Sequence, residues 1–322
     1  MKNFRLLPML VAALWMSGPV AAKNTAISLP PKQDKVPAPL LGGRPGGEKT
    51  GTLFLAFCLD QLTRGNLARA EEACGRALDV NPRDADAYKL RGYAYLTEHR
   101  FERAAADFRA ALRLKPGDGE DLAGYGQSLS GLGQYEAAAG QFRKALAVSP
   151  RKAAYWNGLC WARAGSGRQL GEALTACNRA LAIEPGAAGT LNSRGLVYLR
   201  MKRFDLAIGD YSASLLARSQ QASAWFGRGL ARLSAGEIAG AADIAEARRR
   251  DATIDGMFVT MGVLPDRCDR PGKAQCPPGF PAAAHKAPGA YMAVSYHYDL
   301  DQELADGALK DAAQRRAQLR GR

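Results

Sequence analysis

The sequence predicts an all-α protein, an α-solenoid of six helical hairpins that ends in a capping helix and an irregular tail. Three observations lead to this fold class. Similar segments recur with a period of 34 residues, each period carries a small–large–small pattern, and apolar residues recur every three or four positions in two helix-length segments per period. A single hairpin cannot bury its apolar faces, whereas stacked hairpins can, so a stack is expected.

The composition agrees with a folded globular chain. Of the 322 residues, 47% are hydrophobic and 23% are charged, which argues against wholesale disorder. The chain lacks an apolar stretch of about 20 residues, which excludes a protein with several membrane spans. Only three histidines are present, so we expect no metal site and no cofactor.

The first 22 residues have the pattern of a cleavable secretory signal. Lys2 and Arg5 precede a short apolar core, and Ala21 and Ala22 provide small residues for cleavage. The apolar run is too short to span a bilayer, so we expect no integral span after cleavage and a periplasmic or secreted location. Residues 23–50 are rich in Pro and Gly and are predicted to form a flexible linker.

Internal repeats define the central part of the chain. The segments 68–82, 102–116 and 136–150 align directly, and their closing prolines lie 34 residues apart. The fourth repeat is one residue longer, near Gly167, and the joining turns contain Gly in several copies. The predicted repeats together form a solenoid over 51–255, with the boundaries 51–84, 85–118, 119–152, 153–187, 188–221 and 222–255.

The repeat pattern resembles the tetratricopeptide repeat (TPR) family. Position 4 is bulky in every copy, position 20 is alanine in every copy, and position 27 is alanine in four copies and Ser214 in the fifth. The sixth copy departs most, because its position 27 is Arg248. The residues that carry the resemblance at positions 4 and 20 are Phe54, Tyr88, Leu122, Trp156, Leu191 and Trp225, and Ala70, Ala104, Ala138, Ala173, Ala207 and Ala241. The resemblance implies a right-handed superhelix that binds proteins or peptides in a concave groove.

The cysteines follow this repeat frame. In an antiparallel hairpin with its turn near position 16, positions 8 and 24 lie level. These positions hold Gly and an aromatic residue in repeats two, three and five, and Cys and Cys in repeats one and four. We therefore predict three disulfides, with Cys268 and Cys276 closing a small ring in the tail. Repeat six has Gly229 opposite Ala245 and breaks the rule, and the predicted pairs are Cys58–Cys74, Cys160–Cys177 and Cys268–Cys276.

The segment after the repeats, 256–322, is predicted to form a capping helix and a tail. The apolar stretch 253–264 would cover the last hairpin, whose outer face is otherwise exposed. Residues 265–290 look like a loop, 290–300 like a short strand or docking segment, and 299–319 like a helix.

The resemblance also implies which residues line the groove, because positions 2, 5, 9 and 12 of each first helix point into it in TPR proteins. Asn157 and Asn192 occupy position 5 in adjacent repeats and could bond to a ligand's backbone. Trp161 could cover an apolar side chain, but Trp161, Leu196 and Leu230 could equally pack between repeats. The partner-binding candidates are Lys89, Tyr93, Gln127, Asn157, Trp161, Asn192 and Phe226.

Charge gives little further guidance. The net charge of +13 is spread along the chain. We therefore expect at most a weak association with acidic envelope components, and no binding of nucleic acid. The residues that chaperone-binding TPR proteins use to clamp a terminal carboxylate are not reproduced, because Leu55 and Leu59 stand at those positions of the first repeat.

The sequence therefore predicts a bacterial protein–protein interaction scaffold in the periplasm or outside the cell. It carries none of the nucleophile, zinc or phosphate-loop motifs of common enzymes, so we expect no catalysis by this chain. The alternative is a non-catalytic subunit or adaptor of a cell-envelope assembly or enzyme complex, since fold alone cannot choose between these roles.

Overall fold

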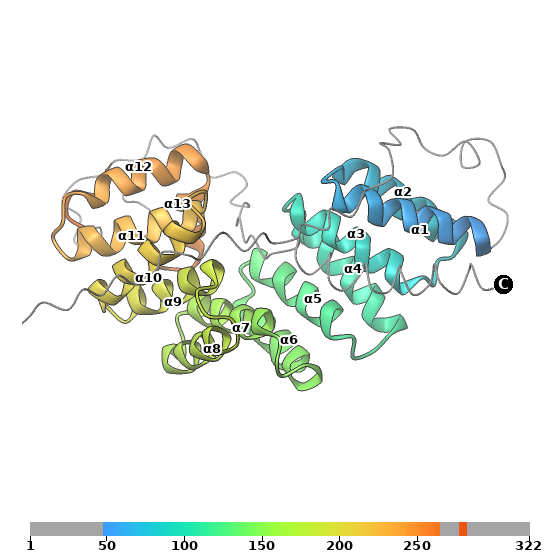
Figure 1. The fold of residues 1–322 in the computed structure, drawn as a ribbon, viewed down its shortest axis with the longest axis horizontal. Coiled ribbons are helices and arrows are strands. Elements are labelled where there is room, and N and C mark those ends of the chain that lie inside the picture. The colour runs from blue at the N-terminus through green and yellow to red at the C-terminus, as the bar shows by residue number, and fades with distance from the viewer. Residues whose placement is uncertain (1–47, 265–276, 282–322) are drawn as a thin grey trace, which may run out of the picture. The chain divides into compact units, whose positions relative to one another are not determined.

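The computed structural model describes residues 48–264 and 277–281, and this part of the chain is built from thirteen α-helices without strands (Figure 1). The prediction of an all-α fold is thus confirmed. The helices are α1 (Glu48–Thr63), α2 (Leu67–Val80), α3 (Ala85–Thr97), α4 (Phe101–Leu114), α5 (Gly119–Gly131), α6 (Tyr135–Val148), α7 (Ala153–Ser166), α8 (Leu170–Ile183), α9 (Ala188–Arg200), α10 (Phe204–Ala217), α11 (Ala222–Ser234), α12 (Gly240–Arg250) and α13 (Ile254–Thr260).

Consecutive helices pack as hairpins, and the hairpins stack in chain order. α1 contacts α2, α3 contacts α4, and so on to α11 and α12, while each second helix also contacts the first helix of the next hairpin. First helices touch one another along the stack, as α3 does with α1 and α5. This is the contact pattern of an α-solenoid, in which each repeat contacts only its neighbours.

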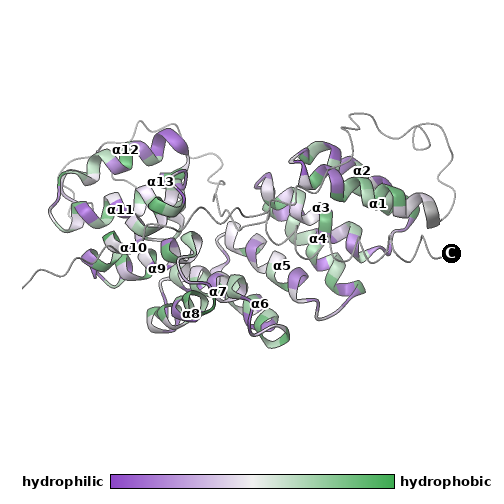
Figure 2. Cartoon of the chain, in the orientation of Figure 1, coloured by the Kyte–Doolittle hydropathy of each residue, from purple (hydrophilic) through white to green (hydrophobic). Residues whose placement is uncertain are grey.

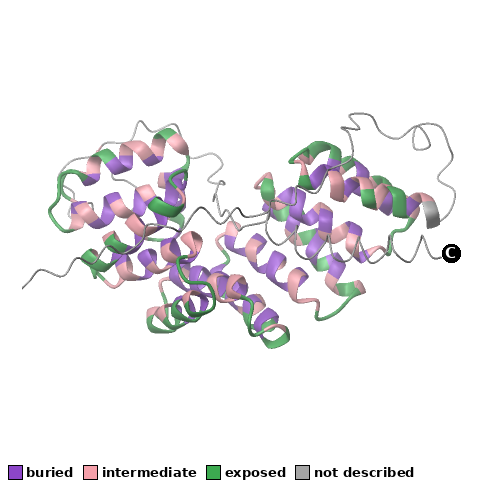
Figure 3. Ribbon diagram, in the orientation of Figure 1, coloured by how far each residue is buried: buried purple, intermediate pink, exposed green. Residues whose placement is uncertain are grey.

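Buried residues recur along the helices where these pack against one another, and exposed residues lie mostly at the turns and on outer surfaces (Figure 3), while apolar and polar residues alternate along the helices (Figure 2). Small residues let the two helices of a hairpin approach closely. The alanines at position 20 of the first five repeats are fully buried: Ala70, Ala104, Ala138, Ala173 and Ala207.

The turn inside every hairpin uses the left-handed backbone conformation at position 15. Gly65, Gly133 and Gly236 have φ angles of 73°, 71° and 87°, as expected for the predicted glycine turns. His99 and Lys202 occupy the same position with φ of 57°, although they carry a Cβ that this conformation disfavours. The turn geometry is therefore kept even where the glycine is missing.

The two kinds of pair predicted at positions 8 and 24 lie face to face. The sulfur atoms of Cys58 and Cys74 are 2.02 Å apart and those of Cys160 and Cys177 are 1.94 Å apart, so both pairs are at bonding distance. In the second repeat, a Cβ added to Gly92 would lie 3.0 Å from the ring of Phe108. Each of the first five hairpins thus has either a sulfur pair or a ring against a glycine at this level.

The aromatic ring also needs space in the following repeat. A Cβ added to Gly124, at position 6 of repeat three, would lie 2.4 Å from Phe108. Gly227 stands in the same relation to Tyr211, at 2.2 Å. Where position 24 is cysteine, position 6 of the next repeat carries a side chain, in Leu90 and Ser193. The residue type at position 24 is therefore coupled to the residue at position 8 of the same repeat and to the residue at position 6 of the next repeat.

Repeat six breaks the rule as predicted, but the predicted partner of Gly229 is wrong, because the hairpin is one residue shorter. Gly229 faces Ile244 rather than Ala245, with 2.7 Å from an added Cβ to the side chain of Ile244. The same shift places Ala247, fully buried, at the position assigned to Arg248. Repeat six thus keeps the small–large–small pattern. A 34-residue repeat shifts the predicted positions in its second helix by one residue.

The predicted capping helix is present as α13, which spans seven residues and contacts α11 and α12. Ile254 and Phe258 are buried in the core of the last repeats. Several predictions lie outside the described residues: the signal 1–22, the linker as far as residue 47, the Cys268–Cys276 pair, and the tail at 265–276 and 282–322. Within the described ranges, no helix is both long and apolar enough to cross a membrane.

Candidate functional site

The candidate site is the groove face, which we define as positions 2, 5, 9 and 12 of the first helix in each hairpin. Three of the predicted binding residues on this face are only partly buried. Lys89 lies on α3, Gln127 on α5 and Asn157 on α7, so each of three successive repeats presents one polar side chain. An amide such as Gln127 or Asn157 can both donate and accept hydrogen bonds.

The other four predicted binding residues are buried. Trp161 is 3% exposed and Tyr93 7%, and the Tyr93 ring meets Phe108 edge-on at 5.0 Å between centroids. Asn192 is 4% exposed and donates to the Ser223 hydroxyl over 3.2 Å. Phe226 is fully buried. These side chains pack between helices. Leu196 and Leu230, which are 1% and 2% exposed, also pack between repeats rather than lining an open groove.

The C-terminal segment covers the groove face at repeat six. The ring of Phe226 lies 4.6 Å from that of Phe258 in α13 and 6.2 Å from that of Phe280. Met257 and Met261 join the same apolar core. Side-chain burial therefore increases along the groove face from the first repeats to the last.

Two arginines hold this covering segment in place. Arg200, at the end of α9, donates to the carbonyl oxygens of Gly165 and Met261, and so connects repeats four and five to the cap. Arg248 donates to the carbonyl oxygen of Pro281 over 3.2 Å and lies over the Phe280 ring. The described residues 277–281 are thereby attached to the last hairpin.

A cluster of carboxylates surrounds Lys89 at the open end of the groove face. Its ammonium lies 3.1 Å from Asp118, 3.5 Å from Glu120 and 4.0 Å from Asp121. Burial lowers the pKa of Lys89, but the carboxylates of Asp121, Asp118 and Glu120 outweigh it and hold that pKa above its ordinary value. Lys89 therefore stays charged and tied to α5.

Asp121 is the exceptional member of this cluster. Its side chain is fully buried, and neither carboxylate oxygen accepts a hydrogen bond from a described residue. Burial raises the pKa of the Asp121 carboxyl to about 7; Lys89 opposes this, whereas Asp118 and Glu120 add to it. The cluster thus carries a surplus of negative charge that depends on pH near neutrality.

A recurrent ion pair, which was not predicted from the sequence, also joins the two helices of a hairpin. Arg91 binds Asp107 through two hydrogen bonds of 2.7 and 2.9 Å, and Arg194 binds Asp210 through two of 2.7 and 2.8 Å. Both pairs join positions 7 and 23, which directly precede the facing positions 8 and 24. The recurrence of Arg at position 7 together with Asp at position 23 is visible in the sequence and could have predicted this ion pair.

The groove face offers binding groups rather than reactive ones. Among the described residues, no group of three or more His, Cys, Asp or Glu is placed to hold a metal ion. The four cysteines with described positions are paired as sulfur–sulfur contacts. What remains on the open part of the face is two amides, an ion-paired lysine and the carboxylates around it.

Solved structures show the same fold at low sequence identity. A protein in a structure titled Functional Characterization of Pseudomonas aeruginosa pilF matches with a TM-score of 0.50 and 18% identity, covering 64% of this chain and 93% of that one. A tetratricopeptide repeat protein from Parabacteroides merdae matches with a TM-score of 0.51 and 14% identity, over 66% and 88% of the two chains. A chain of the APC/C hetero-tetramer Cut9–Hcn1 matches with a TM-score of 0.57 and 17% identity, over 66% and 42%. Comparison with curated protein sequences gives no match.

The family comparison is decisive because it covers more than half of the chain. A tetratricopeptide repeat model matches three stretches, 55–119, 126–188 and 192–253. Proteins of this family serve as scaffolds for protein–protein interaction and are generally not catalytic. With the stacked hairpins and the repeat pattern already described, this protein belongs to the tetratricopeptide repeat family.

Proposed function

We propose that this protein is an extracytoplasmic scaffold that binds a peptide or protein partner through the groove face of repeats two to four. One observation carries the proposal. Lys89, Gln127 and Asn157 stay partly exposed on three consecutive first helices. The matching residues of repeats five and six are buried, Asn192 against Ser223 and Phe226 against Phe258 of the C-terminal segment.

The amides suit recognition of a peptide backbone. Gln127 and Asn157 can each satisfy a carbonyl and an N–H group of a bound segment, which makes the binding tolerant of side-chain identity. Asn157 has an Oδ1 atom that is buried and accepts no bond from the described residues, so a small movement of this side chain on binding would gain a hydrogen bond.

The local charge favours a cationic group on the partner. Asp118, Glu120 and Asp121 lie around the single ammonium of Lys89. This surplus of carboxylates contrasts with the net charge of +13 of the whole chain. A lysine, an arginine or a free amino terminus of the partner would find a favourable potential at this end of the groove face.

The paired cysteines support a location outside the cytoplasm. Sulfur–sulfur bonds persist in oxidising compartments and are rare in the cytosol. Two pairs occur inside helical hairpins at equivalent positions, in agreement with a role in holding the hairpin closed. Together with the signal-like pattern of residues 1–22, this supports a periplasmic or secreted protein.

The double substitution Gln127→Ala and Asn157→Ala tests the groove. We expect it to reduce at least tenfold the amount of partner recovered after crosslinking in the native cell envelope, with an unchanged melting temperature. Gln134→Ala is the control, because it removes an exposed amide that is not on the groove face. Equal recovery from the double variant and from wild type would reject binding through these amides.

A further inference from the structure

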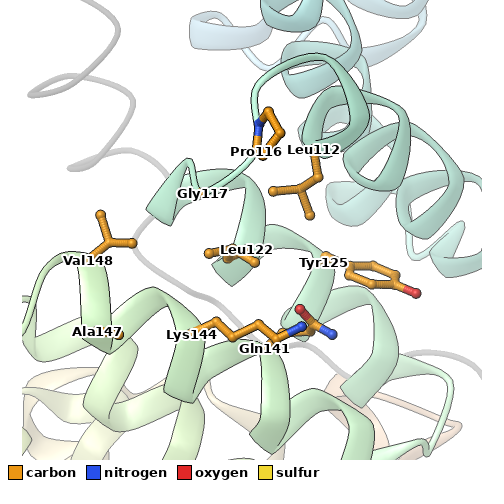
Figure 4. Close-up of a pocket in the computed structure, with 9 residues that line it drawn as sticks. All are labelled: Leu112, Pro116, Gly117, Leu122, Tyr125, Gln141, Lys144, Ala147 and Val148. Carbon is orange, nitrogen blue, oxygen red and sulfur yellow. The ribbon is translucent and has the colours of Figure 1, made fainter.

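A cavity lies away from the groove face, between α4, α5 and α6 (Figure 4). Its volume is about 560 Å³ and its walls are mainly apolar. The lining residues share no position with the groove face; they are Leu112, Pro116, Gly117, Leu122, Tyr125, Gln141, Lys144, Ala147 and Val148.

Repeat three has a leucine at position 4, where repeats one, two, four and six have an aromatic ring. Position 4 is Trp156 in repeat four and Trp225 in repeat six. The indole N–H of Trp156 donates to the carbonyl oxygen of Pro150 over 2.8 Å, and that of Trp225 donates to Ser219 over 2.8 Å. In repeat three the residue at position 4 is Leu122, which has neither the ring nor the donor.

The acceptor that the tryptophans use is still present in repeat three. Pro116 occupies the position that Pro150 and Ser219 hold in the other two cases, and it lines the cavity. No hydrogen bond to the Pro116 carbonyl oxygen is found among the described residues. The cavity therefore offers, beside apolar walls, the acceptor that an indole uses in repeats four and six.

Repeat three also differs at the positions next to the cavity. Repeats two, five and six place an arginine at position 7 and an aspartate opposite it, but repeat three has Tyr125 and Gln141 instead. Val148 on the rim is 53% exposed, which leaves apolar surface in contact with water. Lys144 is exposed and has no acidic partner among the described residues, so one positive charge borders an apolar hollow.

We propose that this cavity binds a tryptophan side chain of a partner peptide, with an acidic residue beside that tryptophan. The indole ring packs against Leu112, Leu122 and Val148, its N–H donates to the carbonyl oxygen of Pro116, and the acidic side chain pairs with Lys144. A buried aromatic anchor with one satisfied donor is a common source of binding energy at protein interfaces. The chain itself shows the arrangement twice, at Trp156 and Trp225.

The probe for this site is the acetylated and amidated peptide Asp-Trp-Asp, titrated into the full chain while methyl NMR signals are recorded. We expect saturable shifts confined to the methyl groups of Leu112, Leu122 and Val148. A peptide with Leu in place of Trp, or Lys in place of both Asp residues, should bind at least fivefold more weakly. Equal binding of the Leu peptide would overturn the indole assignment.

Two variants separate the cavity from the rest of the fold. Leu122→Trp fills the cavity as repeats four and six do, so it should weaken peptide binding at least tenfold and raise the melting temperature. Leu191→Trp, at the same position of repeat five, should leave binding unchanged. Should Leu122→Trp fail to fold, Lys144→Glu gives the same test, with an expected loss of at least fivefold.

Other occupants of the cavity give different results. Shifts at these methyl groups that grow with protein concentration in the absence of peptide would show a second copy of the chain in the cavity and overturn the proposal. No shift with millimolar peptide, or undiminished binding to Leu122→Trp, would overturn it as well. Shifts confined to signals of the groove face, which is remote from this cavity, would show that the peptide binds there and would overturn the proposal too.

Discussion

Arg228 of α11 and Asp243 of α12 form a two-pronged ion pair across 15 residues, with two hydrogen bonds of 2.8 Å. The matching pair Arg194–Asp210 spans 16 residues. The single missing residue lies in the turn after α11, and it leaves the packing of the hairpin unchanged. The ion pair therefore marks the register of a repeat more faithfully than a residue count does.

The ion pairs should contribute measurably to stability. Arg194→Met or Asp210→Leu alone leaves a partly buried charge without its partner, and each should lower the free energy of unfolding by about 2 kcal/mol. The double variant should lose less than the sum, because no charge is then left unpaired. Urea unfolding of the four proteins measures this coupling. Arg179→Met, on an exposed site, should change little, and additive losses would show that the pair contributes nothing of its own.

The coupling between three positions predicts a rescue. Replacing Cys160 by Gly and Cys177 by Phe recreates the pair found in repeats two and three, but the new ring meets Ser193 in the next repeat. We expect this double variant to melt well below wild type, and the added change Ser193→Gly to recover part of the loss. The triple variant should also lose its dependence on reductant at this hairpin. A third substitution that lowers the melting temperature further would contradict the coupling.

Removal of the sulfur bonds should destabilise the oxidised protein. Each closes a loop of about 16 residues, for which chain-entropy estimates give roughly 3 kcal/mol. We expect the melting temperature to fall when reductant is added, and Cys58→Ala with Cys74→Ala to reproduce part of that fall. Mass spectrometry of the unreduced protein provides the control, since detection of free thiols at these four positions would show that the bonds do not form.

The turn at position 15 offers a stabilising substitution. Lys202 is exposed and has φ of 57°, a conformation that costs a residue with a Cβ roughly 1 kcal/mol. Lys202→Gly should therefore raise the free energy of unfolding by somewhat less than this amount, because glycine also gains entropy in the unfolded chain. The reverse change, Gly236→Lys, should lower it. Denaturant titrations that show both substitutions acting in the same direction would rule out this explanation.

Asp121 should give the protein a stability that depends on pH. Its pKa is about 7 in the folded chain and near the ordinary 3.8 when unfolded, so between these values the folded state holds a proton that the unfolded state has lost. Stability should consequently fall as the pH rises from about 4 to about 7, by up to about 1.4 kcal/mol per pH unit from this group. Asp121→Asn should remove this slope and be more stable than wild type at pH 8. Parallel pH profiles for the two proteins would disprove the assignment.

Much of the fold could be read from the sequence because the repeat is local. Contacts inside one hairpin are visible in the sequence as the 34-residue period, the alanine at position 20, and the Gly–aromatic or Cys–Cys pairs at positions 8 and 24. The chain repeats this pattern several times, which makes it recognisable. The shortened turn before Gly240 could not be read this way, since a fixed count assigned Arg248 to the site that Ala247 fills.

The candidate site could be predicted only in part. Burial of Phe226 and Asn192 depends on residues that lie far from them in the chain, such as Phe258 and Ser223, and position within a repeat does not contain that information. The cavity at Leu122 likewise follows from a comparison between repeats. Its signal was present in the sequence, as a leucine at a position where two other repeats have tryptophan.

The central claim is that the partner binds on the groove face of repeats two to four. A photo-crosslinking amino acid placed at Gln127 in the native cell envelope tests it most directly, with the same group at the exposed Arg179 as the control. We predict a discrete crosslinked partner from position 127 that is absent from position 179. The same adduct from both positions, or none from position 127 while the chain remains folded, would contradict the claim.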